Sequence, residues 1–280
     1  MSYVDFILNL AGLLLWTKWR SLPFDPFTKR TPATLVGTLR RAAPSRFRRW
    51  HLLAGIGLLL FLRALVYWWI GAASHWTARL DLNVMSLSFR SDWFGRMFLF
   101  SVFSFGLTLG VFYLWLLLLS LLRGKSAAAE PVHRLVRVQL GKTDDWPHWV
   151  KAILPFAGGL ILWWLASWLL TWQEIIPRPV SAMHRIEEAM VVGMAAYLAW
   201  KFIAAALLVL HLVNTYVYFG RHPFWNYVHD TAQNLLAPLR KIPLRGGKMD
   251  FAPVVGIALI FLIAGLLERG LVWLYSRLPF

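Results

Sequence analysis

The chain has no cysteine and few acidic residues: its 280 residues include 13 Asp and Glu against 29 Lys and Arg. Without cysteine there is no disulfide framework, no thiolate metal cluster, no thiol nucleophile and no c-type haem attachment. Only 15% of the residues are charged, compared with about 25% in soluble domains. The chain is instead 59% hydrophobic, with 17 Trp. This composition indicates surfaces that face something other than water.

Apolar runs of membrane length account for the excess of hydrophobic residues. A shorter apolar segment, 3–17, contains Asp5 and Asn9, so it could either cross a bilayer or lie in its interface. We predict an all-α fold, a polytopic transmembrane helix bundle. The five segments that are long enough to cross about 30 Å of hydrocarbon lie at roughly 51–73, 97–122, 152–172, 189–213 and 253–275.

Basic residues alternate between heavily and lightly charged loops. The counts of Lys and Arg are nine in 18–50, three in 74–96, six in 123–151, two in 173–188 and five in 220–250. Because basic loops stay on the cytoplasmic side, the sequence predicts a multi-pass protein of the bacterial inner membrane with its C-terminus, Phe280, outside. The residues expected to face anionic headgroups are Arg40, Arg41, Arg46, Arg48, Arg49, Lys241, Arg245 and Lys248.

The first basic loop also has a composition that nucleic acid could bind. Its run 29–49 follows one apolar segment and precedes the first long one. That position favours an anionic lipid surface over nucleic acid as the partner. We therefore interpret the net charge of +16 mainly as an indication of which loops face the cytoplasm.

Each of the three loops that are rich in Lys and Arg contains a residue-Pro-apolar triplet, followed by an amphipathic stretch. The prolines of these triplets are Pro26, Pro131 and Pro223. We interpret the pattern as three helix-loop-helix hairpin repeats that share one orientation. The expected repeats are 1–73 with its basic cytoplasmic loop, 74–172, and 173–280.

The third loop is the most distinctive stretch of the sequence. Helical spacing is followed by Phe224, Trp225, Val228, Ala232, Leu235 and Leu236. This spacing predicts a short amphipathic helix on the cytoplasmic face of the membrane, before Pro238. The arrangement resembles the YggT (YlmG) family of integral membrane proteins over about 205–275, with the two earlier hairpins as degenerate copies. The matching motif positions are Pro223, Phe224, Leu236, Pro238, Leu239, Arg240, Pro243, Gly246, Gly247, Asp250 and Pro253.

The resemblance implies a non-enzymatic role and no cofactor. It implies a function in cell division, envelope organisation, nucleoid or chloroplast partitioning, osmotic tolerance, or assembly of a membrane complex such as haem-carrying cytochrome b6. Partners would be the anionic bilayer and other membrane or division proteins. The resemblance supplies no catalytic residues, so the motif positions are expected to be structural or to face partners.

Charged residues inside the apolar segments are the main anomaly: Lys201, Glu268, Arg63 and Arg269. A lysine at mid-bilayer costs on the order of 3 kcal/mol on insertion scales and usually has a partner. Glu268 is the expected partner of Lys201, with Tyr67 and Tyr197 as weaker candidates. A buried structural pair is favoured; an ion pathway, in a transporter or channel using Lys201 and Glu268, is the alternative function.

Other chemistry-bearing groups give weak signals. No two histidines stand at ligand spacing within one helix, so haem ligation is not favoured. Asp144, Asp145 and His148 are better explained as a helix start than as a metal site, and we predict no metal. Gly106 with Gly110, and Ala189 with Gly193, allow close helix approach. Packing within the chain is the favoured use, and a homo-oligomer is left open.

Overall fold

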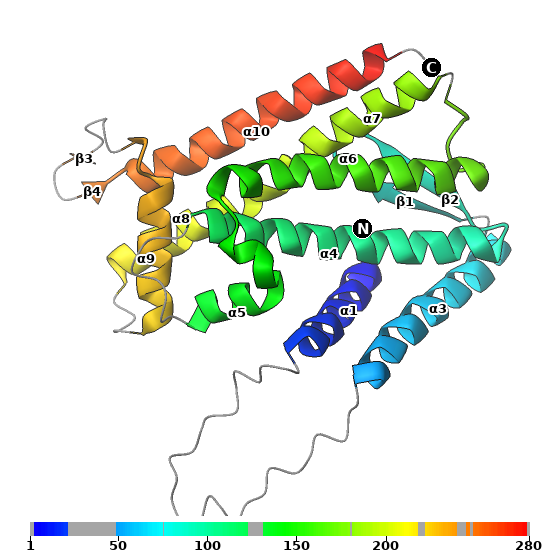
Figure 1. Ribbon diagram of the computed structural model, residues 1–280, viewed down its shortest axis with the longest axis horizontal. Coiled ribbons are helices and arrows are strands. Elements are labelled where there is room, and N and C mark those ends of the chain that lie inside the picture. The colour runs from blue at the N-terminus through cyan, green and yellow to red at the C-terminus, as the bar shows by residue number, and fades with distance from the viewer. Residues whose placement is uncertain are drawn as a thin grey trace, which may run out of the picture. The chain divides into compact units, whose positions relative to one another are not determined.

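The computed structural model describes residues 3–21, 49–74, 76–122, 131–179, 181–217, 222–239, 245–246 and 249–278. The chain divides into two compact units. Unit 1 contains residues 1–76 and 91–109, and unit 2 contains residues 77–90 and 110–280. The helix α4 (Phe94–Leu121) contributes its first part to unit 1 and its second part to unit 2 (Figure 1).

Within the described part of the chain, five helical segments are long and apolar enough to cross a membrane, which confirms the five predicted spans. The fourth is longer than predicted, at 35 residues. It consists of α7 (Ala182–Ala195), a 3-10 turn (Ala196–Ala199) and α8 (Trp200–Tyr216). The others lie in α3 (Arg49–Ser74), α4, α6 (His148–Trp172) and α10 (Ala252–Arg277). The fold is therefore that of a mostly helical, multi-pass membrane protein.

In unit 1 the helix α1 (Tyr3–Ser21) has a polar buried face and an apolar exposed face. Its buried residues are Asp5, Asn9 and Gly12, which share one face of the helix. The large apolar side chains point outward, among them Phe6 and Leu14, which are 60% and 63% exposed. This is the reverse of a water-soluble amphipathic helix. The doubtful segment 3–17 is thus helical, although α1 is not among the five spans, and whether it crosses stays open.

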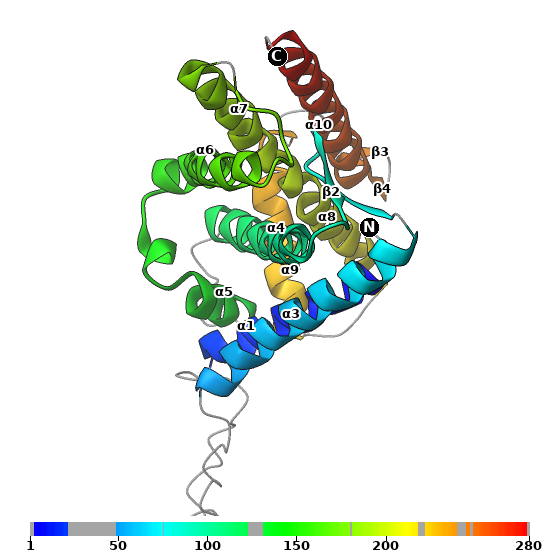
Figure 2. The ribbon, with the colours of Figure 1, turned by 90° about the vertical axis from the view of Figure 1, so that its right-hand side faces the viewer.

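Unit 2 contains a β-hairpin that the sequence analysis missed. Strands β1 (Thr77–Asp81) and β2 (Ser86–Arg90) pair antiparallel, with alternate residues buried. Asn83 in the turn has φ 64°, a left-handed conformation that Asn tolerates better than most residues. Val84 packs in a cluster with Val191 of α7 and Leu271 of α10, and Figure 2 shows the hairpin beside α10. The all-α prediction therefore needs this correction. A second short pair joins β3 (Arg245–Gly246) to β4 (Met249–Asp250).

Two short amphipathic helices of unit 2, α5 (Pro131–Leu140) and α9 (Pro223–Leu235), begin at the prolines of the second and third triplets. Proline suits a first helical position because its missing N–H would be unpaired there anyway. The two helices pack against each other (Figure 1). The first triplet lies outside the described residues, so the threefold repeat and its boundaries stay predictions.

Helices α6 and α7 cross at two glycines. A Cβ on Gly193 would lie 2.7 Å from the carbonyl oxygen of Phe156, and one on Gly159 would lie 2.9 Å from Cα of Gly193. Close packing at Ala189 and Gly193 is confirmed, since Ala189 is fully buried. The other predicted pair was wrong as an intramolecular contact: a Cβ on Gly106 or Gly110 would meet nothing within 4 Å among the described residues.

Candidate functional site

The predicted ion pair between Lys201 and Glu268 is present in unit 2. Lys201 Nζ, on α8, lies 3.0 Å from Oε2 of Glu268 on α10. The lysine side chain is 14% exposed and the glutamate side chain 37%. The two weaker candidate partners of Lys201 bind elsewhere, because Tyr197 donates to the carbonyl of Ala152 and Tyr67 donates to Asp5.

Lys201 follows directly on the 3-10 turn that separates α7 from α8. Such a turn disturbs the regular i to i−4 hydrogen bonding of an α-helix. Two tryptophans bond across it: Trp115 Nε1 of α4 donates to the carbonyl of Ala199 at 2.8 Å, and Trp200 Nε1 donates to the carbonyl of Leu114 at 2.9 Å. These reciprocal bonds fix α8 against α4 one residue before the lysine.

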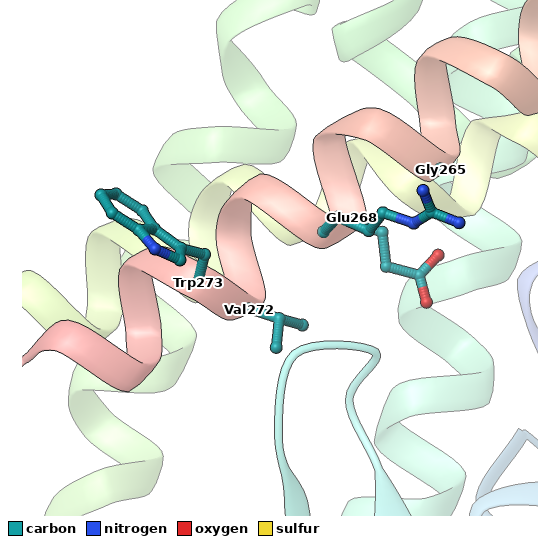
Figure 3. Close-up of a pocket in the computed structure, with 5 residues that line it drawn as sticks. Gly265, Glu268, Val272 and Trp273 are labelled. Carbon is teal, nitrogen blue, oxygen red and sulfur yellow. The ribbon is translucent and has the colours of Figure 1, made fainter.

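Glu268 also lines a shallow hollow on the outer face of α10, together with Gly265, Arg269, Val272 and Trp273. Figure 3 shows the carboxylate of Glu268 on the same side of the helix as Val272 and below Gly265. Arg269 itself is exposed. The intramembrane charges of α10 are therefore accessible from outside the helix bundle, unlike the buried charges of unit 1.

Arg63 has a partner that the sequence analysis did not predict. Its Nη2 lies 2.7 Å from Oδ1 of Asp5, and its Nη1 donates to Oδ1 of Asn9 at 2.7 Å. Ser104 of α4 also accepts from Arg63, at 2.9 Å. Tyr67 donates to Asp5 at 2.6 Å. The polar residues that made the membrane crossing of segment 3–17 doubtful, Asp5 and Asn9, are thus the ones that bind Arg63. A helical wheel of 3–17 would have shown that both lie on one face of the helix.

A second buried polar cluster joins α4 to α6. Lys151 Nζ donates to the hydroxyl of Ser120 at 2.8 Å and to the carbonyl of Asp144 at 2.5 Å, and Ser120 donates to Oδ1 of Asp144 at 2.5 Å. All three residues are buried. Asp144 therefore has a structural role here, and His148 is exposed. Among the described residues no group of three His, Asp or Glu side chains could hold a metal ion.

The motif segment is partly described, and that part forms the predicted amphipathic helix. The ring nitrogen Nδ1 of His222 accepts from the backbone N–H of Phe224 and caps α9, with Pro223 at its first turn. Val228 and Ala232 are buried, as the spacing predicted. Three motif positions lie outside the described residues: Arg240, Pro243 and Gly247. So do six of the basic residues expected to face headgroups: Arg40, Arg41, Arg46, Arg48, Lys241 and Lys248. Only the backbone is described for Arg245, Gly246 and Asp250.

Motif residues hold α9 against the two neighbouring spans. Leu236 packs with Leu208 of α8 and Ala232 in one apolar cluster, with Leu239 at its edge. A Cβ on Gly256 of α10 would lie 2.9 Å from Cδ2 of Leu236. Pro253 is buried at the start of α10. These contacts show a structural role for Leu236 and Leu239, and they add Gly256, which the motif comparison did not include.

Two histidines from different helices meet at this end of unit 2. The rings of His211 on α8 and His229 on α9 have centroids 5.0 Å apart. The search for ligand spacing within one helix could not find them, because 17 residues and a turn separate the two positions.

These features together define the class of protein: a multi-pass membrane protein whose spans contain paired charges. Residues 189–271 match the CCB3/YggT family model, so this part of the chain carries the family's pattern, and the resemblance seen in the sequence is confirmed. The matched region contains the Lys201 and Glu268 pair and α9. No curated protein and no solved structure matches the chain.

Proposed function

We propose that this YggT-type protein is a non-enzymatic inner-membrane protein that organises or assembles other envelope components through the cytoplasmic end of unit 2. The observation that carries the proposal is the packing of α5 against α9. Two helices from different basic loops thereby form one surface. Asn234 of α9 adds to this by donating to the carbonyl of Leu122, just after α4, at 2.9 Å.

The surface has the chemistry of a peripheral binding face. Helix α5 exposes Arg134, Leu135 and Arg137, and Leu135 is 42% exposed. Basic side chains near an anionic leaflet contribute about 1 kcal/mol each to its binding. A fixed basic and apolar surface beside the headgroups suits either lipids or an acidic segment of a membrane partner.

The assignment of this end to the cytoplasm follows from charge. The loops 123–151 and 220–250 carry six and five basic residues, against two in 173–188. Retention of basic loops on the cytoplasmic side then places the C-terminus outside. The α5–α9 contact supports a common side for both loops.

The test expresses variants with charge-reversed α5 in a deletion strain and identifies the proteins that co-purify with them. We expect Arg134→Glu with Arg137→Glu to reach the membrane in normal amounts and to lose the proteins that co-purify with the wild type. Arg79→Glu with Arg90→Glu, on the β-hairpin, is the matched control and should behave as wild type. An unchanged set of co-purified proteins in the α5 variant contradicts the proposal.

The second candidate is a transporter or channel, and the accessibility of Glu268 favours it. A carboxylate 37% exposed beside a partly buried ammonium is an arrangement that a proton or ion could use. Proteoliposomes should then show solute flux that Lys201→Leu abolishes. Complementation by Lys201→Leu without flux in the wild type leaves the organising role as the better explanation.

A further inference from the structure

Unit 2 has an enclosed pocket at the end of α6, and no predicted site or motif includes it. Its volume is about 120 Å³. Because one water takes up about 30 Å³, the pocket holds about four waters or one group of similar size. Its walls come from α6, the turn after it, the start of α7, Met85 of the β-hairpin and Tyr275 of α10.

The pocket is at the opposite end of unit 2 from α5 and α9. Helix α6 begins at His148, beside the α5 loop, and ends at Trp172, so Ser167 and Thr171 belong to its last turns. Ser181 caps α7 by accepting from the backbone N–H of His184. The pocket therefore lies toward the end of α6 that the charge pattern assigns to the outer side.

Two positively charged side chains line this pocket. The loop 173–188 has two basic residues, Arg178 and Arg185, and both line the pocket. The acid in its wall, Glu188, is engaged by His184, whose Nε2 lies 3.3 Å from Oε1 of Glu188. Glu187 lies on the other side of that imidazole, 4.0 Å from Nδ1. The pocket is thus lined by two arginines and by one carboxylate that already has a partner, so the lining favours an anion.

Two buried donors in the pocket wall lack acceptors. The indole Nε1 of Trp163 and the Nε of Arg185 have no hydrogen-bond partner among the described residues. Trp163 is only 5% exposed. Leaving such a donor unsatisfied costs about 1–3 kcal/mol, so a group with acceptor oxygens in the pocket would stabilise the protein.

The hydroxyl groups of the lining already donate hydrogen bonds to other protein atoms. The hydroxyls of Ser167 and Thr171 donate to the backbone carbonyls of Trp164 and Ser167. Tyr275 donates to the sulfur of Met85 at 3.6 Å. The donors left for a ligand are therefore the guanidinium groups and the indole, and guanidinium groups are the side chains best suited to bind phosphate oxygens.

We propose that this pocket binds a phosphate group, supplied either by a phospholipid headgroup of the outer leaflet or by a free phosphate. Arg178 and Arg185 bind its charge, and Trp163 donates to one oxygen. The proposal is independent of the organising role assigned to α5 and α9.

The experiment measures unfolding of the purified full chain in micelles of an alkyl maltoside, a detergent that contains no phosphate. Inorganic phosphate is titrated against chloride at equal ionic strength. We expect phosphate to raise the unfolding midpoint in a saturable manner, as a ligand that binds the folded state must. A second arm repeats the phosphate titration in nanodiscs of phosphatidylglycerol.

The variants separate the pocket from a general salt effect. Arg185→Gln should raise the apparent Kd for phosphate at least tenfold, and Trp163→Phe should raise it several-fold while keeping the ring. Trp164→Phe is the matched control, because Trp164 is 50% exposed on the outside of α6, and it should bind phosphate as the wild type does. Should Arg185→Gln fail to fold, Trp163→Phe still tests the proposal.

The lipid arm identifies the source of the phosphate. Loss of the phosphate response in nanodiscs of phosphatidylglycerol identifies a headgroup site, because the lipid phosphate then already occupies the pocket. An unchanged phosphate response in micelles and in nanodiscs identifies a site for a free anion. Equal midpoints in phosphate and chloride in the micelles overturn the proposal, as does a phosphate response that survives in both pocket variants.

Discussion

Arg63, in the middle of α3, forms a buried ion pair with Asp5, near the start of α1, with 2.7 Å between Nη2 and Oδ1. Their side chains are 0% and 5% exposed. Removing one member of such a pair leaves an uncompensated buried charge, whereas replacing both by apolar groups need not destabilise the protein.

We therefore expect Asp5→Leu to reduce the stability of the protein by on the order of 3 kcal/mol, and Asp5→Leu with Arg63→Met to restore most of it. Unfolding by denaturant in mixed micelles measures the effect. Val4→Ala, at an exposed position of the same helix, is the control. Equal stability of Asp5→Leu and wild type would show that α1 does not depend on this pair.

The second prediction concerns the side of the membrane on which α1 begins. Helix α1 runs antiparallel to α3, since Asp5 meets Arg63 and the side chain of Leu15 lies beside Gly55. The start of α1 and the end of α3 then lie on the same side. Because the chain has no cysteine, a single introduced thiol can be labelled without background.

We expect Tyr3→Cys and Arg79→Cys to react with an impermeant reagent from outside intact cells, and Arg137→Cys to react only after the membrane is opened. Tyr3 is 89% exposed, so no other part of the described protein covers the introduced thiol. Labelling of Tyr3→Cys together with Arg137→Cys would place the start of α1 on the cytoplasmic side.

A third prediction follows from the close crossing of α6 and α7. Gly159→Ala would place a Cβ 2.9 Å from the backbone of Gly193, and overpacking of this kind costs about 1–3 kcal/mol. Gly158→Ala is the neighbouring control, since its Cβ would meet nothing within 4 Å, and the better helix propensity of alanine should leave it neutral or slightly stabilising. Thermal unfolding of the two variants side by side is the measurement. Similar midpoints would mean that the helices separate easily at this crossing.

A fourth prediction concerns Lys201 and Glu268. Lys201→Leu leaves a carboxylate alone in an apolar span, so it should lower stability by about 1–3 kcal/mol. Lys201→Leu with Glu268→Leu should recover the loss, and a double-mutant cycle gives the coupling energy. Additive effects of the two substitutions would argue against a structural pair.

The sequence by itself determined the features that depend on local order along the chain. Long apolar runs specify spans, basic loops carry the orientation signal, and the helical spacing of Phe224, Val228 and Ala232 specified α9. The partner of Lys201 could also be predicted, because few acids lie within apolar segments and a charge there requires one.

Only the tertiary structure decided which distant residues meet. Asp5 with Arg63, Ser120 with Lys151, and His211 with His229 each join different helices, and no period within one helix encodes such a pairing. The β-hairpin is stabilised by burial of Val84 against α7 and α10, which short strands cannot reveal alone. The pocket at the end of α6 likewise depends on the fold, because Trp163, Arg178 and Arg185, which are separate in the sequence, line it together.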